Sequence, residues 1–337
     1  MLAVLIGIFV LVLAVLLDLI IGDPSPWKPW KRIYNLHPTV WLGQLTKKLE
    51  PHFKTRNNKL EKFNGIILAL IIICVITIPT YFGLRYLFIS LSYFHIVLGA
   101  VVYLIVAAVL FKFTICIKLE TDGAVAVAKA LEINDVEEAK KYAHFSRRDA
   151  TNLTGPQIGS AVIESMVENL TDFKLSPFLF YAFFGLPGAV AFRAINTLDG
   201  MVGYKDKEHI NTGWFSANLD NLVNYIPSRF TMLLMIISAA ILGYDYKAAW
   251  QIAKRDHKRV QSRNHGWQMA AIAGALHIQL EKPGRYTVGD SIEVITPDKI
   301  LKSLKVRDLS IVLCILMVIP IIVVIGLYLP FLWGLPL

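Results

Sequence analysis

The chain has 337 residues, 55% of them hydrophobic, with a net charge of +9 and a mean hydropathy of +0.54. A soluble domain of this length would be far less apolar, so the composition excludes an ordinary soluble fold and indicates an integral membrane protein. The three cysteines all lie in apolar runs, which indicates neither disulfides nor a cysteine-based metal site. No nucleic-acid-binding motif accompanies the positive charge, so nucleic acid is not an expected partner.

Apolar runs long enough to cross a bilayer recur along the chain. Four are strong, at residues 1–21, 65–89, 94–117 and 309–333, and two are weaker, at residues 177–195 and 230–244. The first run lacks a basic n-region and a small-residue cleavage site, so we expect a retained helix and not a signal peptide. We predict an all-α, polytopic helical membrane protein: one integral-membrane domain over residues 1–337, with four firm spans, two weaker or re-entrant segments and a helical cytoplasmic region.

Basic residues gather between the apolar runs. Residues 22–63 carry nine lysines and arginines against three acids, and residues 244–308 carry twelve against seven. The positive-inside rule places both segments in the cytoplasm and the short loop at residues 90–93 outside. In that case the two weaker runs either both cross the membrane or neither does. We favour the second alternative, in which the polar region of residues 147–229, with residues 263–276, faces the cytoplasm.

Three helices are predicted after the third apolar run. Residues 121–132 and 135–147 have the pattern of ordinary amphipathic helices. Asn134 and Glu137 resemble a capping box at the start of the second helix. A third helix is expected to begin at Thr154, which has its own capping-box partner three residues later.

One face of this third helix, which extends to about residue 173, is acidic. Glu164, Glu168 and Asp172 recur at every fourth residue and therefore lie on one side, with Asn169 at its edge. Such a stripe is either a solvated face or, because its neighbours are apolar, a partly buried set that needs a metal or basic partners. Mg²⁺ that carries phosphate groups would fit, since it takes one or two carboxylates together with phosphate oxygens.

Further polar side chains accumulate after the first of the two weaker runs. Asn196 and Asp199 could present a second pair of oxygen ligands, and Arg193 precedes them. Asp220 and Arg229 follow. Asn and Asp at such spacings are common in turns, so the signal is the accumulation and no single pair. Polar groups that are costly in an apolar chain indicate binding or chemistry.

Two histidine-containing motifs complete the candidates. His37 could be an acid–base group or a phosphate contact, although a lone histidine is more often structural. Arg263, Asn264 and His265 precede small residues that favour close helix packing. At the start of that helix they could meet an anion with the help of its amides. The basic helix face of residues 254–259 is better suited to lipid headgroups. Common nucleotide-binding and hydrolase motifs are absent from the sequence, so a bound nucleotide would use another kind of site.

In these motifs the chain resembles the membrane-bound adenosylcobinamide-phosphate synthase family of cobalamin biosynthesis. The matching segments occur in family order over nearly the whole chain: residues 18–24 (DLIIGDP), 37–43 (HPTVWLG), 148–151, 164–172 (ESMVENLTD), 196–204 (NTLDGMVGY), 219–229 and 264–276. The combination of ESMVEN and NTLDGMVGY is specific. The resemblance implies an ATP-dependent ligase for the step from cobyric acid to cobinamide. It would join a propionate of adenosylcobyric acid to (R)-1-aminopropan-2-ol or its O-phosphate, giving adenosylcobinamide or its phosphate.

The resemblance also implies roles for the candidate residues. A carboxylate is a poor acyl donor, so the reaction would pass through an acyl phosphate, which requires Mg²⁺ and basic residues. Mg²⁺ with ATP is expected at Glu164, Glu168, Asp172 and Asp199. Catalytic roles are expected for Glu168, Asp199, His37 and His265, and either histidine could take the amine proton. Substrate binding is expected at Asn169, Arg193, Asn196, Asp220, Arg229, Arg263 and Asn264.

The expected partners are adenosylcobyric acid, the aminoalcohol or its phosphate, ATP and the lipid bilayer, with an association with later cobalamin-assembly membrane enzymes as a further possibility. Two other functions stay open from the residues alone. A corrinoid or ion-coupled transporter would place the polar residues in broken helices at mid-membrane. An inactive scaffold would keep the fold without the reaction.

Overall fold

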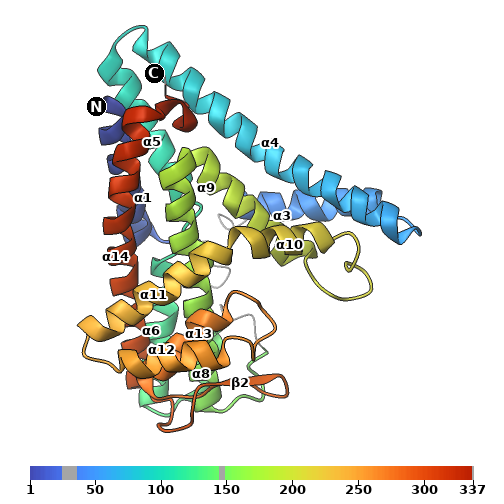
Figure 1. Cartoon of the computed structure of the whole chain (residues 1–337), viewed down its shortest axis with the longest axis vertical. Helices are drawn as coiled ribbons and strands as arrows, with labels where there is room; N and C mark the ends of the chain where they lie inside the picture. Colours follow the sequence, from blue (N-terminus) through green and yellow to red (C-terminus); the bar gives the residue numbers. More distant parts are fainter. Residues whose placement is uncertain (25–35, 144–148, 336–337) are drawn as a thin grey trace. The chain divides into compact units, whose positions relative to one another are not determined.

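The computed structural model describes residues 1–24, 36–143 and 149–335, and over these residues the chain is mostly helical (Figure 1). It forms two compact units, each assembled from separate stretches of sequence. Unit 1 comprises Met1–Cys116, Ser176–Val223 and Met317–Leu337. Unit 2 comprises Ile117–Leu175 and Asn224–Leu316. The predicted helical class is confirmed, with a small two-stranded sheet in addition.

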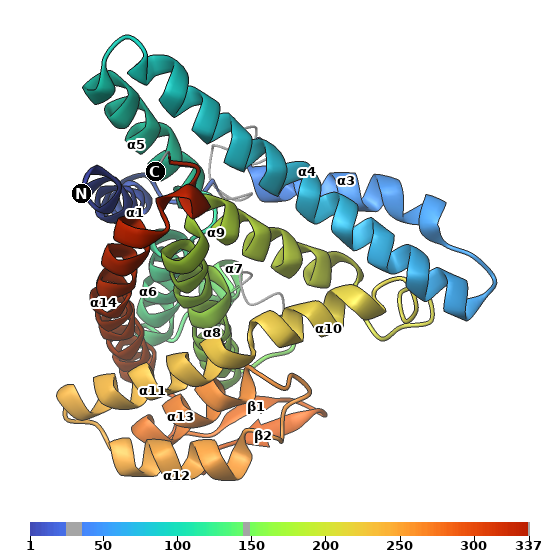
Figure 2. The same cartoon turned by 45° about the horizontal axis from the view of Figure 1, so that its top comes forward.

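Unit 1 contains helices from the first third and the middle of the chain. They are α1 (Leu2–Ile21), α3 (Pro38–Leu49), α4 (Asn58–Ser92), α5 (Ile96–Lys112), α9 (Ser176–Val202) and α10 (Trp214–Val223), with the short 3₁₀ turns η1 (Glu50–Phe53) and η4 (Pro330–Trp333). Figure 2 shows α3 lying beside α4. Their shared core with α9 is apolar, because Leu68 and Ile72 of α4 are buried with Leu42 of α3 and Leu198 of α9.

Helix α9 is kinked at Gly185. There φ is +65°, a left-handed value that glycine adopts without steric cost. Pro187 follows and lacks the amide that a regular helix would use. The close approach of Trp333 also requires glycine, since a Cβ at Gly185 would lie 2.4 Å from a ring atom of that tryptophan. The weaker apolar run at residues 177–195 therefore lies in a broken helix.

Unit 2 is built mainly from the cytoplasmic segments of the prediction. Its helices are α6 (Lys118–Glu132), α7 (Val136–Tyr142), α8 (Gly155–Leu170), the π-helical turn η3 (Thr171–Leu175), α11 (Tyr225–Ile241), α12 (Tyr246–Asp256) and α13 (Gly266–Leu276). Strands β1 (Leu280–Lys282) and β2 (Tyr286–Val288) form an antiparallel hairpin. Helix α14 (Pro297–Tyr328) begins in unit 2 and ends in unit 1. The small residues of α13 allow close packing on α12, where a Cβ at Gly274 would lie 2.5 Å from the Ala248 carbonyl oxygen.

Among the described residues, four helical stretches are long and apolar enough to cross a membrane: Leu2–Ile21, Asn58–Ser92, Gly155–Val202 and Pro297–Tyr328. Helices α10 and α11 form a bent pair that could make a fifth span. These stretches indicate a multi-pass membrane protein, as predicted. The run at residues 94–117 forms α5, which has 17 residues and is shorter than these four. The weaker run at residues 177–195, by contrast, falls within the 48-residue stretch Gly155–Val202, which is long and apolar enough to cross a membrane.

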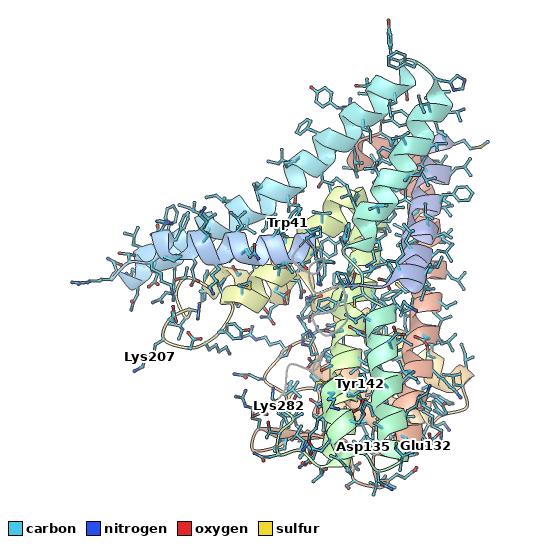
Figure 3. The ribbon with its side chains drawn as sticks, turned by 180° about the vertical axis from the view of Figure 1, so that it is seen from behind. Trp41, Glu132, Asp135, Tyr142, Lys207 and Lys282 are labelled. Atoms are coloured by element: carbon cyan, nitrogen blue, oxygen red, sulfur yellow. The ribbon has the colours of Figure 1, made fainter. Side chains whose placement is uncertain are left out.

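The predicted helix starts are confirmed in one case and wrong in another. Thr154 caps α8 through the expected capping box. Helix α7 is capped by Asp135, which Figure 3 labels, and not by Asn134, because the Asp135 carboxylate accepts an amide of the first turn at 2.9 Å. Asn134 instead has a left-handed φ of 57° in the preceding turn. Helix α7 ends at Tyr142. The end of the predicted helix 135–147, and the start of the predicted polar region, fall in residues 144–148, outside the described residues.

Candidate active site

The acidic stripe of α8 is not a solvated face. Glu164 is 2% exposed, and its carboxylate accepts hydrogen bonds from the hydroxyls of Ser160 (3.0 Å) and Tyr286 (2.7 Å). Asp172 is also buried, whereas Glu168 is half-buried. The three carboxylates therefore have three different environments, and Glu168 is the most accessible of them.

Asp172 lies in η3, a π-helical turn that the sequence did not predict. Such turns are frequent at functional sites. The Asp172 carboxylate oxygens lie 3.2 and 3.3 Å from Nε2 of His265, the residue that precedes α13. Gln268 of α13 donates to the Thr171 hydroxyl (2.6 Å) and to the Ser228 carbonyl (3.0 Å), which fixes α13 against η3 and α11. The structure thus brings together two of the predicted site residues.

A buried ion-pair network anchors this turn. Lys174 is fully buried and pairs with Glu120 of α6, and Arg307 lies 4.0 Å from the same carboxylate. Asn169, a predicted substrate ligand, also hydrogen-bonds to Glu120. Burial raises the pKa of Glu120, and the attraction of Lys174 and Arg307 acts against that rise. The network holds the turn that presents Asp172.

An open cavity of about 680 Å³ lies beside Glu168. Its lining comes from α8, from the segment after α12 and from the β1–β2 hairpin: Glu168, Arg259, Val260, Gln261, Ser262, Lys282, Arg285 and Tyr286. Figure 3 labels Lys282 at the hairpin. Three cationic side chains against one carboxylate give this lining a net positive charge, so the cavity favours an anionic ligand. A hollow of this size with convergent polar groups is typical of a small-molecule site.

The basic side of this cavity is absent from the sequence-based prediction. Arg259 was expected to meet lipid headgroups with the rest of residues 254–259, but it lines the cavity and pairs with the buried Asp256 at 3.0 Å. Lys282 and Arg285 flank a turn between strands of three residues each, which are too short to show alternation. The Pro-Gly pair between them was the signal that could have located the hairpin.

Two predicted substrate ligands meet before α13. Arg229 donates to the side-chain oxygen of Asn264 at 2.9 Å. Its guanidinium lies over the rings of Tyr225 (3.7 Å to the centroid) and Trp267 (5.5 Å). Hydrogen bonding and stacking together fix a planar cation in one orientation. Arg263, also predicted here, is exposed.

In unit 1 the residues predicted around α9 form a second polar set. Arg193 donates to Asn196 at 3.3 Å, and Asn196 donates to Asp220 of α10 at 3.5 Å. Asp199 is half-buried, one turn after Asn196. Gly203 leaves room for its carboxylate, since a Cβ there would lie 2.1 Å from Oδ1 of Asp199. The predicted accumulation of polar groups is therefore real within this unit.

His37 belongs to a different network of unit 1. It is the N-cap of α3, where its Nδ1 accepts the Thr39 amide at 3.3 Å. Its Nε2 lies 3.5 Å from Asp23, and Lys112 pairs with Asp23 and with Asp18 (3.4 Å). Burial acts to raise the pKa of Asp23, but His37 and Lys112 outweigh it and lower that pKa to about 2. Lys112, at the end of α5, was not predicted.

The carboxylates of unit 2 fit a Mg²⁺ ion that is carried by phosphate groups better than one held by protein alone. Within the described part of the chain, no group of three or more His, Cys, Asp or Glu side chains could hold a metal ion. Glu164 and Asp172 already contact partners inside the protein, whereas Glu168 opens on the cavity. Asp199, the fourth expected ligand, belongs to unit 1. One or two carboxylates suffice when phosphate oxygens supply the other positions.

Comparison with known proteins identifies the family. The family model described as CobD/Cbib protein matches residues 11–317. The chain is 38% identical over 305 residues to the probable cobalamin biosynthesis protein CobD of Methanothermobacter thermautotrophicus, covering 90% of this chain and 94% of the relative. It is 34% identical over 307 residues to the corresponding protein of Methanocaldococcus jannaschii, covering 90% and 94%. It is 31% identical over 299 residues to cobalamin biosynthesis protein CobD of Dehalococcoides mccartyi, covering 88% and 91%.

No solved structure matches the chain. The segments that carried the motif resemblance, ESMVEN and NTLDGMVGY among them, lie inside the matched residues. The chain belongs to the CobD/CbiB family of cobalamin biosynthesis proteins.

Proposed function

We propose that the chain is an ATP-dependent acid–amine ligase, an adenosylcobinamide-phosphate synthase. It joins a propionate carboxylate of adenosylcobyric acid to (R)-1-aminopropan-2-ol or its O-phosphate. The observation that carries the proposal is the cationic cavity beside Glu168 in a member of this family. Such a cavity suits a reaction whose reactants include a triphosphate and a carboxylate.

The proposed reaction has two transfers. A propionate oxygen attacks the γ-phosphorus of ATP, the bond from phosphorus to the bridging oxygen of ADP breaks, and an acyl phosphate forms. The amine nitrogen then attacks the acyl carbon, and the carbon–oxygen bond to phosphate breaks. Inorganic phosphate leaves, the nitrogen loses one proton, and the amide remains. The enzyme must therefore hold several anionic groups together and accept a proton.

Arg259, Lys282 and Arg285 are proposed to hold the phosphate groups. Cations fixed in a cavity stabilise the charge of the transferring phosphoryl group without reorganising during the reaction. Mg²⁺, when bound to the phosphates, would be held by Glu168 and would neutralise charge on their oxygens. Tyr286, which donates to the buried Glu164 at 2.7 Å, borders the same cavity.

His265 is proposed to accept the proton that the attacking amine releases. Asp172, at 3.2 Å, would orient the ring and stabilise its protonated form. Arg229, held by Asn264, is a preorganised cation for a propionate or phosphate group. Arg263, which precedes Asn264 and is exposed, would add a second positive charge.

In unit 1, the polar set of Arg193, Asn196, Asp199 and Asp220 is proposed to bind amide and carboxylate groups of the corrinoid. Asn and Asp side chains offer the acceptors, and Asn and Arg the donors, that such groups require. His37 is proposed as a second acid–base group, oriented by Asp23.

The test of these roles uses purified protein in lipid nanodiscs with adenosylcobyric acid, Mg²⁺–ATP and aminopropanol phosphate. Glu168→Ala and, separately, Asp199→Ala should lower amide formation by about 10²–10³-fold while the protein stays inserted. Glu137→Ala, which removes an exposed carboxylate from α7, serves as the matched control and should leave turnover unchanged. Near-normal turnover by Glu168→Ala would contradict the proposal that the reaction takes place in the cavity beside Glu168.

A further inference from the structure

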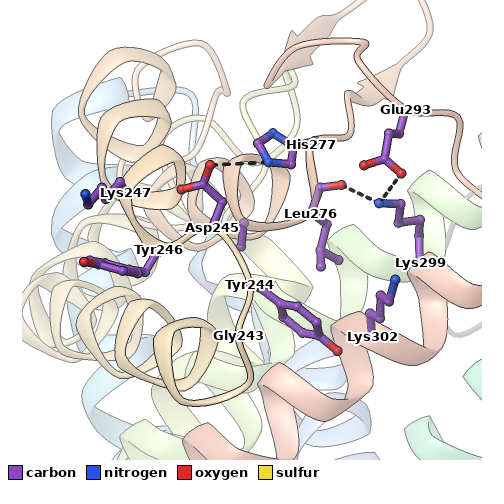
Figure 4. A pocket seen from close by; sticks show the side chains of 11 residues that line it. Gly243, Tyr244, Asp245, Tyr246, Lys247, Leu276, His277, Glu293, Lys299 and Lys302 are labelled. Carbon is purple, nitrogen blue, oxygen red and sulfur yellow. Dashed lines mark hydrogen bonds and ion pairs between the residues drawn. The ribbon is translucent and has the colours of Figure 1, made fainter.

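Unit 2 has a second cavity, of about 430 Å³, at the turn between α11 and α12 (Figure 4). Its lining consists of Gly243, Tyr244, Asp245, Tyr246, Lys247, Ala275, Leu276, His277, Glu293, Lys299 and Lys302. None of these residues lines the cavity beside Glu168, and the proposed reaction does not use them. The volume falls in the range of ligand sites, roughly 300–1,000 Å³.

The negative groups of this lining are already engaged within the protein. Asp245 lies 3.4 Å from Nε2 of His277, and Glu293 lies 2.6 Å from the ammonium of Lys299. Lys299 also donates to the carbonyl of Leu276 at 2.9 Å, at the end of α13. Three lysines and two carboxylates belong to the lining, which therefore carries a net positive charge, and a third carboxylate, Asp298, pairs with Lys302 from outside the lining.

The accessible donors lie on two walls of the cavity. Lys247 is exposed at the start of α12, and on the other wall Figure 4 shows the phenol of Tyr244 beside Lys302. Lys302 pairs with Asp298 one turn earlier at 2.8 Å, a solvent-exposed contact of the kind that contributes little energy and exchanges readily. The Lys302 ammonium and the Tyr244 hydroxyl are suitable donors for a phosphate group, and Lys247 adds positive charge at the other wall.

Two apolar helices approach this cavity. Helix α11 exposes a column of large side chains, Leu233, Ile237 and Ile241, with one in each turn. Helix α14 exposes Val312 and Leu316 in the same way. In a multi-pass membrane protein, such columns face the lipid chains.

The cavity opens at the polar end of both columns. The hydroxyls of Ser238 and Ser310 lie 3.0 Å apart and fix the register of α11 against α14. From that level α11 runs three residues further, to Ile241, with Gly243 two residues beyond its end, and Lys302 is eight residues back along α14. At 1.5 Å per residue the two helical steps are about 4.5 and 12 Å, so both cavity walls lie just beyond the apolar region, where headgroups begin.

The outer face of α12 also suits the membrane surface. Tyr246 and Trp250, one turn apart, are 46% and 41% exposed, and the ammonium of Lys254 lies 5.1 Å from the Trp250 ring. The opposite face buries Ala249 and Ile252. Tyrosine and tryptophan beside lysine on one side of a helix are typical of the interfacial region of a membrane.

We propose that this cavity binds the phosphate headgroup of an anionic phospholipid, with α12 lying in the headgroup layer. The site is separate from the proposed ligase chemistry. It would hold the end of α11 and the start of α14 at the membrane surface.

The experiment measures lipid binding to the purified, delipidated full chain by native mass spectrometry. Phosphatidylglycerol should bind at one site more tightly than phosphatidylcholine. The double substitution Lys247→Ala with Lys302→Ala should weaken phosphatidylglycerol binding by about 30-fold, because each lysine near anionic lipid contributes about a fivefold effect. Lys205→Ala with Lys207→Ala removes the same charge from an exposed loop of unit 1 and should leave that affinity unchanged.

Equal phosphatidylglycerol binding by the wild type and the double variant would overturn the proposal, as would equal affinity of the wild type for phosphatidylcholine. Displacement of the lipid by inorganic phosphate at equal concentration would assign the cavity to a soluble anion instead. Lys302→Arg keeps the charge and should keep the affinity, and Lys247→Ala alone, at an exposed side chain, should weaken phosphatidylglycerol binding about fivefold. Amide formation by these variants at saturating substrate should match the wild type.

Discussion

Asp256 shows how one carboxylate organises the basic side of the candidate site. It is fully buried at the end of α12 and accepts two hydrogen bonds from Arg255, each at 2.8 Å. Arg259, which lines the cavity, lies 3.0 Å away, and the Gly289 amide donates at 2.9 Å. Burial alone would raise the pKa of Asp256, but the bonds from Arg255 and Gly289 outweigh it and lower that pKa.

Asp256→Asn should therefore destabilise the protein in a pH-dependent way. A carboxylate with a lowered pKa contributes stability above its unfolded pKa of about 4, and that contribution is lost as the pH falls. We expect the variant to lose about 2 kcal/mol of unfolding free energy at pH 7, with a difference that shrinks below about pH 4. Unfolding in detergent between pH 3 and pH 7 measures this. Asp298→Asn, at an exposed ion pair, is the control and should change little; a constant Asp256→Asn deficit across the range would contradict the assignment.

The contact between Asp172 and His265 predicts coupled effects on catalysis. If Asp172 acts by orienting the histidine, then removing either group disables the same proton transfer. Asp172→Asn and His265→Ala should each lower amide formation by about 10²-fold or more. The double variant should be no slower than the slower single variant, since residues that act as a unit are not additive. Multiplicative losses in the double variant would show independent roles.

At the scale of elements, the turn η3 depends on the buried charge of Lys174, whose burial the hydropathy of the sequence does not predict. Lys174 is buried against Glu120, so Lys174→Met should leave this buried carboxylate without its close cation, with Arg307 4.0 Å away, and cost about 3–5 kcal/mol. Adding Glu120→Gln should restore much of that stability, because the buried carboxylate is then replaced by a neutral amide and Arg307 keeps its ion pair with Asp308. Unfolding of the single and double variants in detergent checks both steps. A double variant that is less stable than Lys174→Met would contradict this account of the turn.

Sequence signals predicted local structure where the interactions that form it act between residues close in the chain. The capping box of Thr154 and Pro187 in the weaker run act within one turn of chain, and both appear in the structure. The capping box predicted from Asn134 is wrong because the aspartate one residue later supplies the cap. The sequence of residues 171–175 gave no sign that the helix changes to a π-helical turn there. The reason is that the turn is held by Glu120, which lies in a distant segment of the chain.

At the scale of the whole molecule, the requirements of the bilayer allow the long apolar helices to be predicted from sequence. A span needs about 20 apolar residues whatever its neighbours, so hydropathy located α1, α4 and α14, although it ranked the run at residues 177–195 below the shorter α5. The cavity beside Glu168 has no such signature. Arg259, Lys282 and Arg285 come from two segments that are distant in sequence from α8, and each segment looks ordinary by itself. The spacing of the acidic residues on α8 was enough to predict the acidic side of this cavity, whereas its basic side could be found only from the fold.

The orientation expected from the positive-inside rule is also a whole-molecule prediction. In a chain whose native cysteines are replaced, a cysteine at Lys258 should react with a membrane-impermeant maleimide only in inverted vesicles. A cysteine at Tyr93, in the short turn after α4, should react only in intact cells. Labelling of the Lys258 position in intact cells would place the basic segment, and the candidate site with it, outside.

The amide-forming assay tests the central claim most directly. Purified protein in nanodiscs is given adenosylcobyric acid, Mg²⁺–ATP and aminopropanol phosphate, and product is followed by mass spectrometry together with phosphate release. The account predicts an amide that forms only when both ATP and Mg²⁺ are present, with one phosphate released per amide. Tight corrinoid binding without any amide, under conditions in which an active relative turns over, would contradict the ligase and favour a transporter or a scaffold.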